Sequence, residues 1–437
     1  MRGDFDYTAV DLGLNTDRPV IVYGLGGSGK VVRAVLEEAG VPLVLCDDEP
    51  KENNIIAARD VDVAGAQALI KSPGIDMRAD LVMRAKEAGV PVYGEIDLWW
   101  RARRHDGARV IGVTGTNGKS TVTALIAHVL RCAGYDAVEG GNLGTPALAL
   151  SRVKAGGFYV LELSSYHCEM LQGLALDVGI FTNLTPDHLA RHGDMAGYLA
   201  AKRRMFEVGG RREAGDERPA MKAVAGEAGL VEGAIIADSH SVEGRDVGGL
   251  LGPHNAQNIA CAWEAVKAWM TEEGFWRGVQ TFRPLSHRME HVADVVRNGV
   301  SISFVNDSKA TNGDSAVWAL RSFKNIIWIC GGQAKSDGLG AAVKALDNVK
   351  VALTLGACGE DFGRDLKALG IETAYCETLE GAFDWLRGRD LTDMAGDAGE
   401  LAVLLSPAAA SWDQFANFEA RGDRFKDLVV DFVANAA

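Results

Sequence analysis

The sequence contains few cysteines, and none of them lies in a paired motif. Seven cysteines occur in 437 residues, and no two have the Cys-x-x-Cys spacing. An odd number without paired spacing argues against a disulfide framework and favours buried, reduced thiols, as in the cytosol. No zinc-ligand spacing and no Ser-His-Asp order stand out either. We therefore expect neither a disulfide-rich secreted protein nor a zinc enzyme nor a serine hydrolase.

Basic residues and long apolar runs are also scarce. The chain has 45 lysines and arginines against 59 aspartates and glutamates, a net charge of −14. This charge would repel a phosphate backbone overall, so we expect no nucleic-acid partner, while a local pocket for a small phosphate is not excluded. No stretch reaches the roughly 18 apolar residues of a transmembrane helix, and the acidic start has no signal core. These features predict a cytoplasmic protein that does not insert into membranes.

The length of the chain and the alternation of its elements predict three α/β domains. A chain of 437 residues, 47% of them hydrophobic, is long enough for two to four domains with ordinary cores. Short apolar runs alternate with helical patterns throughout, which is typical of mostly parallel sheets covered by helices on both faces. We expect a Rossmann-like domain at 1–106, a central P-loop-type ATPase domain at 107–283 and a second Rossmann-like domain at 284–437.

The most informative segment is the glycine-rich turn at 112–121. It follows the apolar run 109–111 and precedes apolar residues at helical spacing. A strand that enters such a turn before a helix start leaves backbone N–H groups unsatisfied, which makes a cradle for phosphates. Lys119 adds a positive charge for the outer phosphates, and Ser120 offers a hydroxyl to Mg²⁺. Val113 stands where the strict P-loop spacing has glycine, so we interpret the turn as a compressed P-loop variant.

A second glycine-rich turn lies near the start of the chain. Residues 24–29 follow the apolar strand 20–23, and the acids Asp47 and Asp48 lie about 20 residues further on. This spacing matches the dinucleotide fingerprint, in which a helix N-terminus holds a phosphate and an acid holds a ribose. On its own the motif is compatible with a nicotinamide cofactor, a UDP group or no ligand. The basic stretch 101–105 is interpreted as a solvated linker.

Three candidates for chemistry follow in the central region. Glu162 lies in an apolar strand, and a carboxylate there either binds a partner such as a metal ion or reaches solvent. The segment 183–188 ends another strand, where ligands collect in open α/β sheets, so Asp187 and His188 suit an oxygen-rich Mg²⁺ shell. Lys202 lies in an apparent helix, and its local spacing alone predicts a solvated surface charge.

The remainder of the chain predicts a loop-rich stretch and a third strand–helix unit. Residues 207–250 are rich in Gly, Glu and Asp and are interpreted as loop, and the next helix is expected to begin near Asn258. In the third region we expect strands at 301–305, 326–330, 349–355, 371–375 and 401–405, with helices at 361–369 and 379–386.

Polar side chains follow three of these strands. The segment 306–312 combines acid, hydroxyl, lysine and amide groups, which suits the anchoring of ribose, phosphate or carboxylate groups, or else forms a polar capping loop. Lys335 also lies just past a strand end. Ser411 lies in the segment 406–411, where it either caps the helix that carries Phe418 or lies beside N–H groups that hold a carboxylate.

Several separated motifs together match one family. They are, in order, Gly115-Thr-Asn-Gly-Lys-Ser-Thr121, Gly141-Asn-Leu-Gly144, Glu162-Leu-Ser-Ser165, Asn183 to His188, Lys202, His254-Asn-x-x-Asn258, Asp307-Ser-Lys-Ala-Thr311, Leu405-Ser-Pro-Ala408 and Asp413-Gln-Phe-x-Asn-Phe-x-x-Arg-Gly422. With these motifs the chain resembles the Mur ligases over nearly its whole length. The Asp-Asn-Pro-Arg segment of the diaminopimelate- or lysine-adding members does not occur.

The resemblance implies an ATP-dependent amide ligase that adds D-glutamate to UDP-N-acetylmuramoyl-L-alanine in peptidoglycan precursor synthesis. In such an enzyme the substrate carboxylate attacks the γ-phosphate of ATP, and the resulting acyl phosphate is captured by the amine. The resemblance also implies two Mg²⁺ ions, a CO₂-derived carbamate on Lys202, and a monomer that closes its third domain over the second about a hinge near 281–287.

The same resemblance implies a role for each motif residue. The catalytic residues would be Lys119, His188 and Lys202. The ATP site would comprise Gly115, Thr116, Asn117, Gly118, Lys119, Ser120, Thr121, Asn258, Arg288 and Asp307. The metal ligands would be Ser120, Glu162, His188 and Lys202. The UDP-substrate site would comprise Gly26, Gly27, Ser28, Asp47, Asp48, Gly74 and Asn142. The amino-acid site would comprise Lys309, Thr311, Lys335, Ser411 and Phe418.

Three alternatives stay open from the sequence. A related ligase, specific for another amino acid such as L-glutamate or similar to folylpolyglutamate synthase, would share the ATP site. An oxidoreductase is suggested by the turn at 24–29, and a nucleotide-sensing scaffold would keep the motifs without turnover. The chain also departs from the family at His167, where glutamine is expected, at Gly27, and at 47–49, which lacks a terminal arginine.

Overall fold

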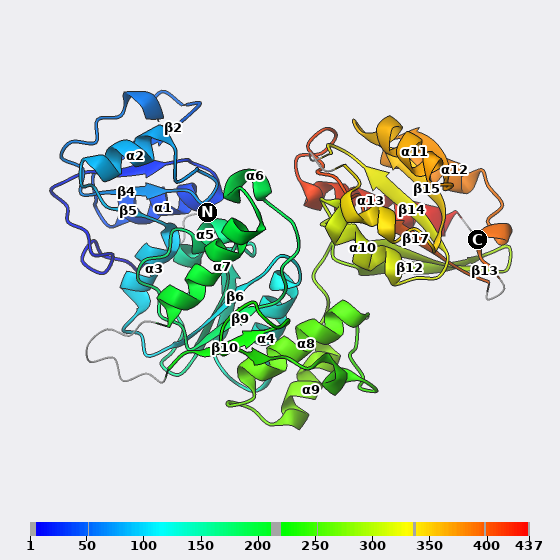
Figure 1. Ribbon diagram of the computed structural model, residues 1–437, viewed down its shortest axis with the longest axis horizontal. Helices are drawn as coiled ribbons and strands as arrows, with labels where there is room; N and C mark the ends of the chain where they lie inside the picture. Colours follow the sequence, from blue (N-terminus) through cyan, green and yellow to red (C-terminus); the bar gives the residue numbers. More distant parts are fainter. Residues whose placement is uncertain are drawn as a thin grey trace. The chain divides into compact units, whose positions relative to one another are not determined.

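The computed structural model describes residues 6–50, 52–210, 220–250, 252–334, 338–396 and 399–435. The chain divides into two compact units, Met1–Phe282 and Arg283–Ala437. The first unit contains two sheets and the second contains one (Figure 1). The α/β class and the parallel sheets predicted from the sequence are confirmed. The residue boundaries of three separate domains stay a prediction.

The first sheet is parallel, with strand order β3-β2-β1-β4-β5. All four residues of the central strand β1 are buried, as expected for a parallel strand covered on both faces. The strands are β1 Val20–Tyr23, β2 Leu43–Asp47, β3 Ile56–Ala57, β4 Ala68–Lys71 and β5 Val92–Tyr93. The helices are α1 Gly27–Glu38, α2 Asp80–Glu87 and α3 Glu95–Arg103.

The second sheet is also parallel, with strand order β11-β10-β9-β6-β8-β7. Its strands are β6 Arg109–Thr114, β7 Ala137–Gly141, β8 Phe158–Glu162, β9 Val178–Phe181, β10 Lys222–Ala225 and β11 Ile235–Ile236. Its helices are α4 Lys119–Cys132, α5 Ser165–Cys168, α6 Leu189–His192, α7 Met195–Gly209, α8 Pro253–Val266 and α9 Glu272–Thr281.

Two expectations for the second sheet are wrong. The stretch 207–250 is not all loop, because β10 and β11 extend the sheet beyond β9. These strands are short, so their apolar runs are hidden among the polar residues around them. The next helix, α8, begins at Pro253 and not near Asn258. Proline is tolerated at the first position of a helix, where its missing N–H has no intrahelical partner.

The third sheet has strand order β12-β13-β17-β14-β15-β16, and β12 is antiparallel to β13 while the other pairs are parallel. The strand β12 was not predicted, because its residues alternate between exposed and half-buried and it has no continuous apolar run. The strands are β12 Glu290–Arg297, β13 Val300–Asn306, β14 Ile326–Gly331, β15 Val349–Leu355, β16 Glu372–Glu377 and β17 Glu400–Leu405. The helices are α10 Gly313–Arg321, α11 Gly359–Ala368, α12 Leu379–Arg387 and α13 Phe418–Ala434.

The first two sheets share a hydrophobic core. Trp99 of α3 is fully buried and meets the ring of Tyr159, on β8, edge to face at 5.0 Å. The interpretation of 101–105 as a solvated linker is wrong for 101–103, which form the end of α3, while Arg104 and His105 are exposed. Arg103 is buried beside two acids, 2.5 Å from Asp6 and 3.8 Å from Asp106. Local spacing predicted solvent exposure because it does not show the acids that neutralise this guanidinium.

Two further features bear on the predictions from composition. All seven cysteines are free: five are buried, Cys376 is half-buried and Cys132 is exposed, so the expectation of buried thiols is wrong at Cys132. Five short 3₁₀ helices complete the described structure, at Ala58–Asp60, Ala147–Ala149, Ser239–Val242, Gly340–Lys344 and Thr392–Met394. Within the residues described, no helix is both long and apolar enough to span a bilayer.

Candidate active site

The glycine-rich turn between β6 and α4 adopts a conformation that requires glycine. Gly115 has φ +141° and Gly118 has φ +79°, and α4 begins immediately after Gly118. A Cβ atom on Gly118 would lie 2.2 Å from Oδ1 of Asn258, on α8. The turn therefore brings its backbone against α8, and it leaves the first N–H groups of α4 directed out of the helix as a phosphate cradle.

The turn is held by hydrogen bonds from the segment that follows β9. The backbone N–H of Asn117 donates to Oδ1 of Asn183 at 2.9 Å, and the hydroxyl of Thr182 donates to the Asn117 carbonyl at 2.6 Å. The hydroxyl of Thr116 donates to the Thr185 carbonyl at 3.1 Å. Because these contacts fix the loop backbone, the cradle is formed before a ligand arrives. The Nζ atom of Lys119 donates to the Thr116 carbonyl at 2.7 Å.

Glu162 is buried at the end of β8 and lies against the start of α4. Only 2% of the residue is exposed. The Ser120 hydroxyl donates to Glu162 Oε2, and Nδ2 of Asn142 donates to Oε1 at 2.6 Å. The alternative in which this carboxylate reaches solvent is therefore wrong. A carboxylate and a hydroxyl in contact at a phosphate cradle are hard oxygen donors, so the residues present fit Mg²⁺.

In the described part of the chain, protein side chains alone do not form a complete metal site. No group of three or more His, Cys, Asp and Glu side chains gathers there in a way that could hold a metal ion. Mg²⁺ is commonly bound by one or two protein groups and by substrate phosphates, so the pair of Ser120 and Glu162 suits an ion that arrives with a nucleotide.

Lys202 is buried on α7 and points at the phosphate loop. The residue is 1% exposed, and its Nζ donates to the Gly115 carbonyl at 2.6 Å and lies 4.6 Å from the centre of the Tyr198 ring. The prediction of a solvated surface charge is wrong, because helical spacing alone does not show that α7 presents this residue to the loop. Burial, and after it the charge of Lys119, lowers the pKa of Lys202 to about 7.

His188 follows β9 and immediately precedes α6, in a left-handed conformation with φ +54°. The Tyr166 hydroxyl and His188 Nδ1 lie 3.0 Å apart, and His188 Nε2 lies 3.4 Å from an Asp187 carboxylate oxygen. In the strand order β9-β6-β8, the strand before His188 (β9) and the strand that ends at Glu162 (β8) lie on either side of β6, which leads into the phosphate loop.

The first-sheet residues predicted to bind UDP gather at the carboxyl edge of that sheet. The N–H of Leu25 donates to Asp47 at 3.2 Å, and the Tyr23 hydroxyl donates to Asp48 at 2.5 Å. The Ser72 hydroxyl donates to the Gly24 carbonyl at 2.6 Å, which brings the turn containing Gly74 against the glycine loop of Gly26, Gly27 and Ser28. Asn142 does not belong to this group, because it lies beside Glu162.

In the second unit, Asp307 is buried at the end of β13. It accepts hydrogen bonds from the Ser406 hydroxyl at 2.8 Å and from the Met289 N–H, next to Arg288, at 3.2 Å. Burial raises the pKa of Asp307 to about 7. Nζ of Lys309 lies 3.9 Å from the centre of the Phe418 ring.

The other predicted residues of this unit are placed as follows. Thr311 follows Lys309 in the loop between β13 and α10, and Ser411 is buried. Ser411 does not cap the following helix, because α13 begins at Phe418 and is capped by the side chain of Asn417. Lys335 lies outside the described residues.

Comparison with known proteins identifies the family. Residues 113–212 match the Mur ligase middle domain. A UDP-N-acetylmuramoylalanine--D-glutamate ligase of Bradyrhizobium diazoefficiens is 37% identical over 94% of this chain and 96% of that protein. A protein of the same name from Novosphingobium aromaticivorans is 39% identical, with 93% of each chain covered. This chain belongs to the Mur ligase family. UDP-N-acetylmuramate-alanine ligase MurC from Thermotoga maritima shares its fold, with a TM-score of 0.57 at 18% identity, over 95% of this chain and 99% of that one.

Two arginines of this Mur ligase contact segments that carry predicted site residues, but the sequence analysis gave neither of them a role. Arg421 is 1% exposed, and its guanidinium donates to the Ser308 carbonyl at 2.9 Å, the Ala409 carbonyl at 3.1 Å and the Ala410 carbonyl at 3.3 Å. It thus joins loops that carry predicted amino-acid-binding residues. Arg421 lies in the terminal motif 413–422 that supports the family resemblance, and this position was the signal that could have identified it. The second is Arg191 on α6, in the segment after His188.

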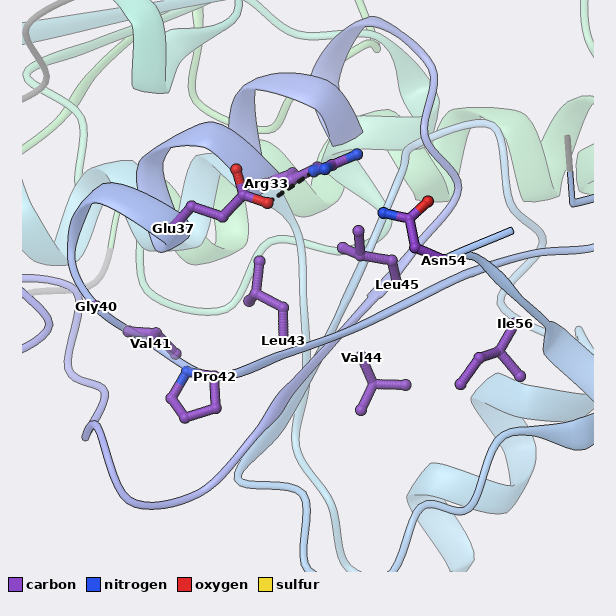
Figure 2. A pocket seen from close by; sticks show the side chains of 10 residues that line it. All are labelled: Arg33, Glu37, Gly40, Val41, Pro42, Leu43, Val44, Leu45, Asn54 and Ile56. Carbon is purple, nitrogen blue, oxygen red and sulfur yellow. Dashed lines mark hydrogen bonds and ion pairs between the residues drawn. The ribbon is translucent and has the colours of Figure 1, made fainter. Parts of the chain in front are cut away.

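A separate hollow of about 550 Å³ opens in the first sheet of this Mur ligase. It is lined by Arg33, Glu37, Gly40, Val41, Pro42, Leu43, Val44, Leu45, Asn54 and Ile56 (Figure 2). These residues belong to the second half of α1, the β2 segment and the approach to β3, and none is a predicted site residue. This hollow therefore does not mark the predicted chemistry, and we assign the active site from the arrangement of polar groups around the phosphate loop.

Proposed function

We propose that this chain is an ATP-dependent ligase that joins D-glutamate to UDP-N-acetylmuramoyl-L-alanine and thereby makes a peptidoglycan precursor. The observation that carries the ATP-dependent part is the fixed phosphate cradle at the start of α4, where Lys119 lies against the loop backbone and Ser120 contacts Glu162. The similarity over nearly the full length to ligases named for these two substrates supports the choice of acid and amine. Because its substrates are cytoplasmic metabolites, we place the reaction in the cytoplasm.

In the first step, the substrate carboxylate attacks the γ-phosphate of ATP, forming an acyl phosphate and ADP. Phosphoryl transfer needs alignment and charge compensation more than covalent help from the protein. Backbone N–H groups at the start of α4 and the Lys119 ammonium hold the phosphates. Ser120 and Glu162 would hold Mg²⁺, which neutralises charge on the phosphate oxygens. His188 would be a further ligand of the metal, from the side of the loop opposite Glu162.

In the second step, the amine of D-glutamate attacks the acyl carbon and displaces inorganic phosphate. An acyl phosphate hydrolyses readily, so water must be excluded until the amine arrives. We propose that Lys309, Thr311, Lys335, Ser411 and Phe418 hold the amino acid and that the second unit closes over the first to exclude water. Asn258, Arg288 and Asp307 would contact the adenine, phosphate and ribose of ATP.

We further propose that CO₂ modifies Lys202. A neutral amine is needed for this step: its nitrogen bonds to the carbon of CO₂, and one proton is released, leaving an N-linked carboxylate. The lowered pKa of Lys202, about 7, makes the neutral amine abundant at physiological pH. The carbamate keeps an N–H for the Gly115 carbonyl and presents an anion that suits a second Mg²⁺.

Release of inorganic phosphate, measured with each substrate omitted in turn, tests the proposed function. We expect release only when ATP, UDP-N-acetylmuramoyl-L-alanine and D-glutamate are all present. We also expect the protein to elute as a monomer in size-exclusion chromatography. A preference for L-glutamate would keep the chemistry and change the amino acid. Release with a folate acceptor in place of the UDP-sugar would favour the related folylpolyglutamate-type ligase. No release with any acid and amine would contradict the proposal.

A further inference from the structure

Arg191 connects helix α6 of the second sheet to a turn of the first sheet. Its Nη2 donates to the Ile75 carbonyl at 2.6 Å, its Nη1 donates to the Gly74 carbonyl at 3.4 Å, and Nη1 lies 3.4 Å from an Asp76 carboxylate oxygen. The side chain is only 10% exposed. One guanidinium therefore binds three consecutive residues of the turn, and Gly74 is a predicted substrate-binding residue.

The same guanidinium also contacts helix α5, whose Tyr166 lies against His188. Nη2 also pairs with Glu169, at the C-terminal end of α5, and the guanidinium carbon lies 5.1 Å from the centre of the Tyr166 ring. The Tyr166 hydroxyl is 3.0 Å from His188 Nδ1, and the two rings lie 4.9 Å apart. A continuous set of contacts thus runs from the Gly74 turn through Arg191 and Tyr166 to His188.

A second cation, from strand β4 of the first sheet, also binds this turn. Nζ of Lys71, which is 1% exposed, donates to the Ile75 carbonyl at 2.8 Å, so that two cations from different sheets bind one oxygen. Hydrogen bonds from Arg78 hold the pKa of Asp76 well below its usual range, so Asp76 is an anion at neutral pH. These charges favour a single arrangement of the turn, because a guanidinium fork fits its acceptors only in fixed directions.

We propose that Arg191 is a positioning residue that sets the separation between the Gly74–Asp76 turn and His188, and thereby aligns the acid substrate with the phosphoryl donor. This inference rests on the proposed function, in which the turn contacts the UDP-linked acid and His188 lies at the phosphoryl-transfer site. Arg191 itself need not contact either substrate. Its effect is to fix the distance between two groups that do, and misplacement by about 1 Å is enough to lower turnover up to 100-fold.

The test compares Arg191→Met with the control Arg59→Met. Arg59 also pairs with an acid of the first-sheet region, Asp60 at 3.7 Å, but its side chain is 83% exposed and it lies outside the Gly74–Asp76 turn. We expect Arg191→Met to lower kcat between about 10- and 100-fold, with the KM for ATP and for D-glutamate within about twofold of the wild type, because the phosphate loop has its own anchors. Arg59→Met should leave kcat within about twofold.

Two further variants keep the proposal falsifiable if Arg191→Met folds poorly. Arg191→Lys retains the charge, but one ammonium cannot reproduce the fork, so it should fold and still lose most of the turnover. Tyr166→Phe removes the hydroxyl at His188. If Arg191 acts through Tyr166, the double variant Arg191→Lys with Tyr166→Phe should lose less than the product of the two single losses.

The outcomes separate this inference from the proposed function. If the wild type shows no substrate-dependent phosphate release, the proposed function fails first. If the wild type is active and Arg191→Lys matches Arg59→Met in kcat, the positioning role is wrong. A loss of turnover that matches the fraction of unfolded enzyme, with a lowered melting temperature and full additivity with Tyr166→Phe, would show a merely structural arginine and would also overturn the inference.

Discussion

The Nζ atom of Lys202 donates a hydrogen bond of 2.6 Å to the carbonyl of Gly115, so helix α7 presents a buried lysine to the back of the phosphate loop. The lysine and the loop are 87 residues apart in the sequence. Neither position alone explains why a cation should be buried at 1% exposure. Their contact makes sense if the amine is modified or neutral, and the lowered pKa of Lys202 agrees with both.

The first prediction concerns CO₂. Carbamate formation consumes neutral amine and releases a proton, so acid and CO₂ removal should both reverse it. We expect enzyme assayed in CO₂-free buffer to lose most of its activity, more at about pH 6 than at about pH 9, and to recover when bicarbonate is added. The Lys202→Ala variant should be inactive with or without bicarbonate. Full activity of the wild type at pH 6 without CO₂ would contradict the carbamate.

A second prediction follows from the same lysine and concerns stability. The folded-state pKa, about 7, lies below the value of 10.5 for an unperturbed lysine. Between these values the unfolded chain binds more protons, so burying Lys202 costs stability fully below about pH 7 and progressively less as the pH rises toward 10.5. In CO₂-free buffer, Lys202→Met should therefore raise the melting temperature at pH 6 by about 2 °C or more, and by less at pH 10. Calorimetry at both pH values checks this, and an equal shift at both would argue against a depressed pKa.

The third prediction removes the loop lysine. Lys119→Ala should cost about 3 kcal/mol or more of transition-state stabilisation, which corresponds to more than about 100-fold in kcat/KM. Steady-state kinetics with ATP as the varied substrate measure this loss. Lys154→Ala is a suitable control, because Lys154 is an exposed lysine of the same sheet region. Near wild-type turnover in Lys119→Ala would refute the assignment of the phosphate site.

A fourth prediction concerns Arg421. Its guanidinium binds the carbonyls of Ser308, Ala409 and Ala410, and a methionine would leave these buried acceptors unsatisfied at a cost of about 1–3 kcal/mol each. We expect Arg421→Met to destabilise the second unit and to raise the KM for D-glutamate about tenfold or more. Arg424→Met, on the exposed side of the same helix α13, should do neither. An unchanged KM would show that these loops do not shape the amino-acid site.

The conformation of motifs whose residues are close together in the sequence could be predicted, because it depends on local backbone geometry. The glycines of the 115–121 loop and the acid at the end of β8 are of this kind, and the structure brings Ser120 and Glu162 into contact. The sequence pattern also predicted the parallel sheets, since buried parallel strands are continuous apolar runs. The strand β12 lacked such a run and was missed.

Residues whose role depends on distant contacts were not predictable from spacing. Lys202 and Arg103 both follow the pattern of solvated charges, and each is buried because a segment far away in the sequence supplies its partner. Arg191 belongs to the same class, since its acceptors lie more than 100 residues earlier in the chain. From the sequence, only the resemblance to Mur ligases gave Lys202 a role, and the structure shows that its side chain is buried against the phosphate loop.

The central claim is that the acid substrate is activated as an acyl phosphate beside Lys119. The most direct measurement uses UDP-N-acetylmuramoyl-L-alanine labelled with ¹⁸O in its terminal carboxylate, with ATP and D-glutamate, and follows the label by mass spectrometry of the products. Transfer of one labelled oxygen to inorganic phosphate in each turnover is the result that we predict. Unlabelled phosphate, formed while the amide product accumulates, would contradict the claim.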